Sequence, residues 1–142
     1  MKKNKHIILL TLLLASYGCS LEENNDINSI INRNYQRYNQ SEVDFDNFAA
    51  ILKEYSTKIN QKEYNSVENI KETSDKFVKN LNERNISKNY PVKATKSEIE
   101  LFKSLINDLT KWMEKEKITK NLTNYYINKS FGFFVEEIIQ KE

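Results

Sequence analysis

"SEIELFKSLINDLTKWM", residues 97–113, is the most strongly amphipathic stretch of the chain. Its apolar residues recur every three or four positions, the spacing that places side chains on one face of a helix. Ser97 and Glu100 stand three positions apart, so we expect them to form a capping box where this helix begins. The apolar face comprises Ile99, Phe102, Leu105, Ile106, Leu109, Trp112 and Met113. A stripe this wide predicts a helix that packs into a globular core.

Four other stretches show the same helical spacing of apolar residues, and with the first they cover most of the chain. They span residues 26–38, 41–59, 67–81 and 122–139. Asp26 is the expected N-cap of the first stretch, and Ser41 with Asp44 imitates a capping box at the start of the second. The third stripe has a polar gap at Thr73 and Ser74. We therefore expect up to five helices.

The scarcity of glycine and proline favours helices over strands. The chain holds two glycines and one proline, and no Asn-Gly or Asp-Gly pair that would close a tight hairpin. Pro91 forbids a continuous helix through residues 85–95, which form the clearest break. The apolar stripes keep no strict heptad over several repeats, so a long coiled coil is disfavoured. The sequence predicts an all-α fold, a small antiparallel bundle of four to five helices around one core.

The N-terminus carries the features of a bacterial export signal. Three lysines among the first five residues precede an apolar segment at residues 7–15, which is too short to cross a bilayer as a helix. Gly18 then precedes Cys19, the only cysteine, in an arrangement that resembles the lipobox of bacterial lipoproteins, although Ser16 replaces the usual leucine. We expect a signal peptide at residues 1–18 and lipid on the Cys19 sulfur. The alternative is a plain secreted protein with an incidental cysteine.

This interpretation divides the chain into a removed leader, a tether and a domain. The leader is residues 1–18, the lipidated tether is residues 19–26, and the helical domain is residues 27–142. Loss of the leader removes three lysines and no acid, so the formal charge changes from +2 to −1. A chain of this charge lacks the basic surface that nucleic acid binding requires. We expect no nucleic acid partner, and contact with a membrane through the lipid on Cys19.

The residue types that remain after export offer little for catalysis. His6, the only histidine, lies in the predicted leader, and Cys19 is assigned to lipid. General bases, nucleophiles and soft-metal ligands are most often histidine or cysteine. Carboxylate pairs remain at Asp44 and Asp46, Glu98 and Glu100, and Glu136 and Glu137. Their places near helix starts and on helix flanks favour capping or solvation. We predict no enzymatic activity, no catalytic residues, no metal site and no cofactor.

Aromatic residues near the C-terminus are the candidates for contact with a partner. Tyr125, Tyr126 and Phe133 lie in a stretch whose main apolar face carries Phe131 and Phe134. Phe133 points away from the middle of that face. Two interpretations stay open: a central helix that is buried on both sides, or an aromatic contact patch of the kind that anchors interfaces. Weaker candidates of the same kind are Tyr64 and Tyr90, in or near connecting segments.

A run of lysines is the other candidate surface. It comprises Lys111, Lys115, Lys117 and Lys120, partly matched by Glu114 and Glu116. The simpler interpretation is a solvated helix face. The alternative is docking to an anionic polysaccharide or to membrane headgroups.

The chain resembles the small plasmid-encoded surface lipoproteins of Borrelia. The likeness is carried by "MKKNKHIILLTLLLASYGCS" at residues 1–20, by the polar segment that follows, and by the helical remainder rich in Asn, Lys and Ile. By size the orf-D type fits, although no motif separates it from its siblings. The resemblance implies a lipid anchor in the outer membrane, display at the cell surface, and non-enzymatic binding of host or vector proteins or polysaccharides. The alternative is a structural or envelope-maintenance lipoprotein that faces the periplasm.

Overall fold

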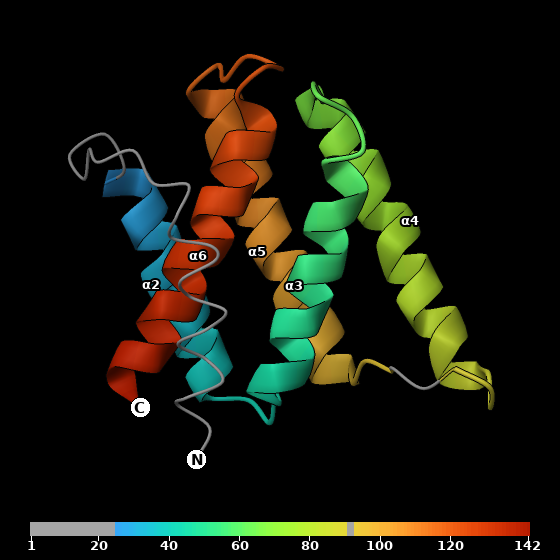
Figure 1. Ribbon diagram of the computed structural model, residues 1–142. Coiled ribbons are helices and arrows are strands. Elements are labelled where there is room, and N and C mark those ends of the chain that lie inside the picture. Colours follow the sequence, from blue (N-terminus) through green and yellow to red (C-terminus); the bar gives the residue numbers. More distant parts are fainter. Residues whose placement is uncertain (1–24, 91–92) are drawn as a thin grey trace.

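The computed structural model describes residues 25–90 and 93–142, and their regular structure is entirely α-helical (Figure 1). The five helices of this part are α2 (Asn25–Asn39), α3 (Phe45–Ile59), α4 (Val67–Ile86), α5 (Lys96–Lys115) and α6 (Thr123–Lys141). The predicted all-α bundle is therefore confirmed. The predicted signal peptide, residues 1–18, and the lipidation site Cys19 lie outside the described residues, as does Pro91.

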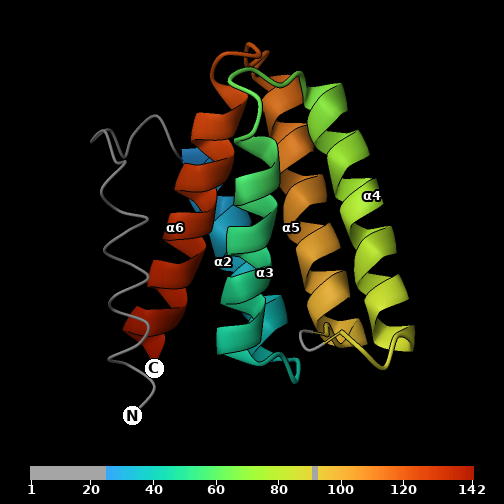
Figure 2. The ribbon, with the colours of Figure 1, turned by 45° about the vertical axis from the view of Figure 1, so that its right-hand side comes forward.

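The five helices pack in a ring rather than in chain order. Helix α2 contacts α5, α5 contacts α4, α4 contacts α3, and α3 contacts α6. Helix α6 contacts α2 and closes the ring. Figure 2 shows α2 behind α3 and α6. Successive helices alternate in direction, whereas the neighbours α2 and α6 run the same way (Figure 1). The bundle is therefore not antiparallel throughout.

The centre of the ring is an aromatic cluster, which we call the aromatic centre. It consists of Tyr55 on α3, Phe77 on α4, Phe102 on α5 and Phe131 on α6. The Tyr55 ring lies 5.0 Å from Phe102 and 5.5 Å from Phe77, in tilted and edge-on geometries that aromatic pairs prefer. Every apolar residue of the stripe predicted in residues 97–113 is buried. Through Phe102, that stripe joins α5 to the aromatic centre.

The N-terminus of α5 is capped two residues earlier than predicted. Thr95 is the N-cap and forms the capping box with Glu98, whereas Ser97 and Glu100 do not. The Thr95 hydroxyl accepts from the Glu98 N–H at 3.2 Å, and Glu98 Oε1 accepts from the Thr95 N–H at 3.0 Å. Glu98 is buried and its second oxygen accepts from the Asp44 N–H. The cap lies at Thr95 because its partner Glu98 is buried and joins the starts of α3 and α5. Glu100 is exposed and does not join them.

The boundaries of α2 and α3 also differ from the prediction. Helix α2 begins at Asn25, inside the expected tether, so Asp26 lies in the first turn and is not the N-cap. Asp44, and not Ser41, caps α3 by accepting from the Asn47 N–H at 2.9 Å. The Ser41 hydroxyl instead donates to the Tyr38 carbonyl and closes the end of α2. A serine or an aspartate can hydrogen-bond the free backbone groups at either end of a helix. Spacing alone therefore misplaced the predicted N-caps of α2 and α3.

The polar gap predicted in α4 is filled by a buried serine. Ser74 lies on the buried face between Ile70 and Phe77, and Arg84 continues that face one turn beyond Leu81. In α6 the stripe is shorter than predicted because Leu122 is 41% exposed.

Candidate functional site

The predicted aromatic residues of α6 form a row with a lysine among them. Tyr126 packs edge-on against Trp112 and Tyr125, with ring centroids 5.1 Å apart in each pair. The Lys129 ammonium donates to the Tyr125 hydroxyl at 3.2 Å and lies 5.8 Å from the Phe133 ring centroid. Phe133 is 9% exposed. The burial of Phe133 agrees with the central-helix interpretation, while Tyr125 and Tyr126 remain half-buried.

The weaker aromatic candidates, Tyr64 and Tyr90, lie in the connections before and after α4. Tyr64 is exposed in the connection between α3 and α4, and Leu122 is exposed before α6. These two connections are joined, because the Thr123 hydroxyl donates to the Asn65 carbonyl at 2.6 Å. Tyr90 follows α4 and its ring lies 4.4 Å from the guanidinium carbon of a buried arginine. The structure does not bring the five predicted aromatic residues into one patch.

The buried arginine at that end, Arg84, forms an ion pair that joins α4 to α3. Its Nη1 donates to Glu54 Oε1 at 3.0 Å, and its Nη2 donates to the second oxygen. The side chain is 4% exposed, and its Nε has no hydrogen-bond partner among the described residues. The hydrogen bond from Arg84 lowers the pKa of Glu54. This perturbed carboxylate is paired within the fold, so its role is structural.

Most of the carboxylates that the sequence offers in pairs cap helices or contact side chains of their own helix. Asp44 and Glu98 cap helices, as described above. Glu137 pairs with Lys141 at 3.2 Å, and Glu136 accepts from the Gln140 amide. Within residues 25–90 and 93–142, no three His, Cys, Asp or Glu side chains gather as metal ligands. No helix in the same residues has both the length and the apolar character to cross a bilayer.

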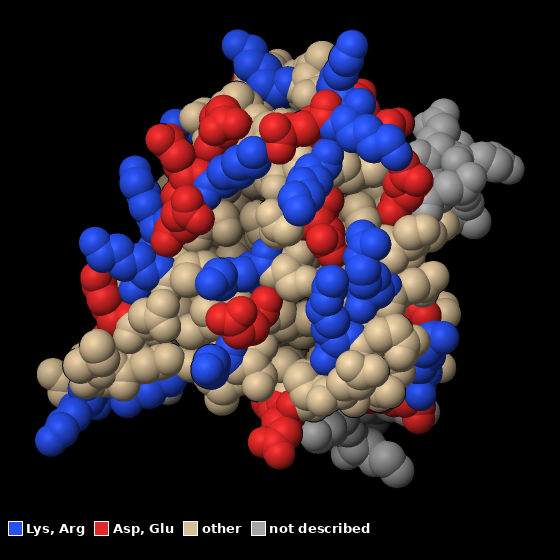
Figure 3. Space-filling model, turned by 180° about the vertical axis from the view of Figure 1, so that it is seen from behind, with Lys and Arg blue, Asp and Glu red and all other residues tan. Residues whose placement is uncertain are grey.

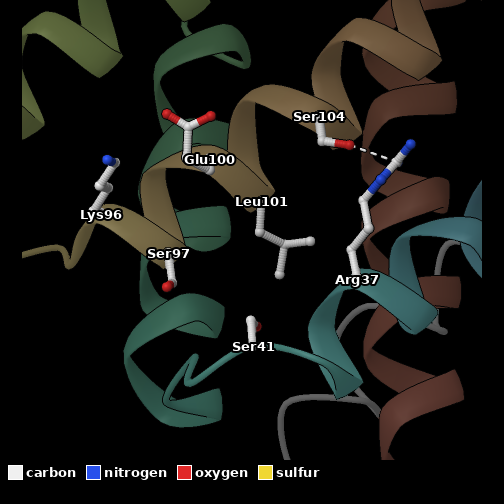
Figure 4. A pocket seen from close by; sticks show the side chains of 7 residues that line it. All are labelled: Arg37, Ser41, Lys96, Ser97, Glu100, Leu101 and Ser104. Atoms are coloured by element: carbon white, nitrogen blue, oxygen red, sulfur yellow. Dashed lines mark hydrogen bonds between the residues drawn. The ribbon is translucent and has the colours of Figure 1, made fainter.

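A hollow of about 420 Å³ lies between α2 and α5 (Figure 4). Leu101 points into its middle, with Arg37 on one side and Lys96 and Glu100 on the other. The Arg37 Nη1 donates to the Ser104 hydroxyl at 2.6 Å and to Asp108 Oδ2 at 3.0 Å. Asp108, which also pairs with Arg33, partly offsets the Arg37 charge, and Glu100 adds a carboxylate to the lining, so the hollow presents charges of both signs.

Two further hollows also mix acidic groups with other polar side chains. Between α2 and α6, Phe133 and Ile31 share a hollow of about 330 Å³ with Glu136 and Glu137. A hollow of about 270 Å³ is lined by Asp26, Arg33, Ile30, Ser29, Asp108, Lys111, Trp112 and Lys115. Figure 3 shows the same mixture over the back of the molecule, where basic and acidic side chains alternate.

A groove of about 350 Å³ between α3 and α4 has a different composition. Three lysines line it, Lys58, Lys62 and Lys76, and no carboxylate does. Sequence reasoning missed these residues because they are spread over two helices and a connection. It selected the compact run from Lys111 to Lys120 instead, in which the Lys115 ammonium pairs with Asp26 at 3.4 Å. Only the fold brings separated lysines together, and we call this site the lysine groove.

The comparisons with known proteins leave the geometry as the basis for any functional assignment. No protein-family model, curated protein or solved structure matches the chain. The likeness to Borrelia lipoproteins therefore stays a prediction.

Proposed function

We propose that this chain is a lipid-anchored surface lipoprotein of the outer membrane that acts as a non-enzymatic binding module. The observation that carries the proposal is the position of Cys19, the only cysteine, after an apolar segment and a small residue. A lone cysteine forms no internal disulfide, and a cysteine at the end of an export signal is the kind of residue to which acyl chains are attached. Two or more acyl chains hold a protein stably on a membrane.

The start of the helical domain fits a short anchor. Helix α2 begins at Asn25, so five residues separate it from Cys19. Five residues reach at most about 18 Å when fully extended. An anchor at Cys19 keeps the bundle next to the headgroups, where its outer surfaces meet soluble or extracellular ligands.

The use of polar side chains supports binding over catalysis. In the described residues, perturbed or buried ionisable groups such as Glu54, Arg84 and Glu98 are engaged in pairs and caps. Catalytic sites instead hold such groups in a cleft, ready for substrate. Tyr125, Tyr126 and Phe133 remain predicted partner contacts, together with the charged grooves.

The anchor is tested by the chemistry of residue 19. Cells that express the chain are grown with labelled palmitate, and the protein is analysed by mass spectrometry. We expect an acylated N-terminal Cys19, with label lost in Cys19→Ser and kept in the neighbouring control Ser20→Ala. An unmodified thiol at Cys19, or a product that keeps residues 1–18, contradicts the anchor.

Surface display is tested separately by adding protease to intact cells. A surface protein is digested without lysis, and we expect this result. Protection until the outer membrane is opened contradicts display and favours the alternative, a periplasm-facing lipoprotein that maintains the envelope. A periplasmic protein of known location serves as the integrity control.

A further inference from the structure

The lysine groove concentrates positive charge that forms no direct ion pair within the described residues. Lys58, Lys62 and Lys76 form no ion pair with any residue in the described part of the chain. The acid closest along α3, Glu54, lies one turn before Lys58 and is hydrogen-bonded to Arg84; the Lys58 charge makes only a smaller, through-space contribution to lowering the pKa of Glu54. Each of the other three hollows has at least one carboxylate in its lining, whereas this groove has none. Unpaired charge of one sign in a concave site attracts ligands of the opposite sign.

The floor and the rim of the groove add contacts of other kinds. The Lys58 ammonium lies 6.0 Å from the centroid of the Phe77 ring, so its charge is held over the floor. Phe77 is 1% exposed and belongs to the aromatic centre, so this floor is rigid. The side chains of Gln61, Thr73 and Asn80 line the groove and make no hydrogen bond within the described residues. They present free amide and hydroxyl groups beside the ammonium groups.

From this arrangement we propose that the lysine groove binds an acidic polysaccharide, a chain of sugars that bears sulfate or carboxylate groups. The ammonium groups pair with the anionic substituents, and the amide and hydroxyl groups of Gln61, Thr73 and Asn80 bond to the sugar hydroxyls. A narrow sugar chain fits a groove between two helices, whereas a layer of lipid headgroups is a plane. The inference rests on the proposed binding role and gives that role a site and a ligand class.

The test compares two triple variants of the full chain, purified in a non-ionic detergent. Lys58→Gln, Lys62→Gln and Lys76→Gln together empty the groove of charge. The matched control carries Lys111→Gln, Lys117→Gln and Lys120→Gln, which changes the net charge equally in the other basic region. Binding to heparin, a sulfated polysaccharide, is measured at several salt concentrations, with uncharged dextran as the blank. Circular dichroism and urea unfolding check that both variants fold.

We expect the groove variant to bind heparin roughly tenfold more weakly, because each solvent-screened ion pair contributes only a few-fold. Its affinity also falls less steeply with salt, since fewer counterions are released. The control variant binds within about twofold of the native chain, a change smaller than one such ion pair. Native chain that does not bind heparin at physiological salt overturns the proposal, as does equal weakening by both triple variants.

Vesicles of phosphatidylcholine with phosphatidylglycerol distinguish the lipid source of anionic groups. If the groove variant loses binding to these vesicles but binds heparin as the native chain does, the groove is a headgroup site. This result overturns the proposal of a polysaccharide ligand. The measurement uses purified protein, so it does not depend on where the chain is displayed. Protection of the chain on intact cells contradicts surface display alone, and absence of heparin binding by the native chain contradicts the groove alone.

Discussion

The aromatic centre and the junction of α2 with α5 hold helices together in opposite ways. The aromatic centre is apolar apart from the Tyr55 hydroxyl, which donates to the Ile70 carbonyl at 2.9 Å. The junction, which we call the polar seam, consists of Arg33, Asn34, Arg37, Ser104 and Asp108. Asp108 Oδ2 accepts from Arg33, Asn34 and Arg37, while both arginines remain substantially exposed.

The contrast separates how strongly helices associate from how they are aligned. Burial of four rings contributes a large free energy that depends weakly on direction. Exposed ion pairs contribute little to stability, but their hydrogen bonds have defined geometry. We infer that the aromatic centre supplies most of the stability, and that the polar seam fixes the register of α2 on α5 across about seventy residues of sequence.

The largest expected effect comes from the aromatic centre. Phe102→Ala removes a fully buried ring that contacts Tyr55 and Phe77. We expect the free energy of unfolding to fall by about 3–5 kcal/mol, the usual cost of a phenylalanine-sized cavity. Urea unfolding followed by circular dichroism measures it. Tyr64→Ala, at a side chain that is 50% exposed, is the control and changes stability by less than about 0.5 kcal/mol. A loss below about 1 kcal/mol for Phe102→Ala would contradict the inference that the aromatic centre supplies most of the stability.

The buried ion pair between α3 and α4 gives the next effect. Glu54→Gln leaves the Arg84 guanidinium buried without its counter-charge. Loss of one partner from a fully buried pair costs about 3–5 kcal/mol, and partial exposure of Glu54 reduces our expectation to about 1–2 kcal/mol. Because Arg84 lowers the pKa of Glu54 in the fold, the pair stabilises above the ordinary value of 4.5 and loses this effect as pH falls below it.

Acid titration therefore sharpens that measurement. The native chain should lose stability relative to Glu54→Gln as pH falls below about 4.5, and the two curves should converge. Lys103→Gln, which removes an exposed pair with Glu100, is the control and should follow the native curve closely. A difference between native chain and Glu54→Gln that stays constant from pH 7 to pH 3 contradicts the assignment.

Sequence reasoning recovered the aromatic centre far better than the polar seam and the grooves. The centre follows from spacing, because Phe77, Phe102 and Phe131 recur with the apolar stripes of their own helices. The seam joins residues about seventy positions apart, and only the ring order of the helices brings Asn34 to Asp108. The same limit explains the lysine groove, whose lysines come from two helices and a connection and are brought together only by the fold.

The polar seam should show a smaller effect that depends on salt. Asp108→Asn keeps an acceptor for the buried Asn34 but removes the charge that pairs with Arg33 and Arg37. We expect a loss of about 0.5–1 kcal/mol at low salt, shrinking in 1 M salt because exposed pairs are screened. Phe102→Ala is the comparison, since its cavity does not respond to screening. A loss for Asp108→Asn that is the same at both salt concentrations would show that the charge is not what matters.

Tyr38 lies near the end of α2, outside both the aromatic centre and the polar seam, and its substitution should have the smallest effect. Its ring packs edge-on against Phe134 of α6, with centroids 6.2 Å apart. Burial, with smaller contributions from Glu142, Tyr35, Asp44 and Asp46, raises the pKa of Tyr38 to about 12. Near pH 7, Tyr38→Phe should change the free energy of unfolding by less than about 0.5 kcal/mol, because the ring and its packing are kept.

The difference should appear only in alkali. A phenol with a raised folded-state pKa favours folding below its ordinary value of 10.0, and this contribution is lost as pH rises from there toward 12. Above pH 10 the native chain should therefore lose stability relative to Tyr38→Phe, as measured by urea midpoints at pH 8 and pH 11. Burial also raises the pKa of Tyr55, but that residue is present in both proteins and cancels in the comparison. An equal separation of the two midpoints at both pH values would mean that the Tyr38 hydroxyl titrates as if in water, and that α6 covers it less closely than the packing against Phe134 requires.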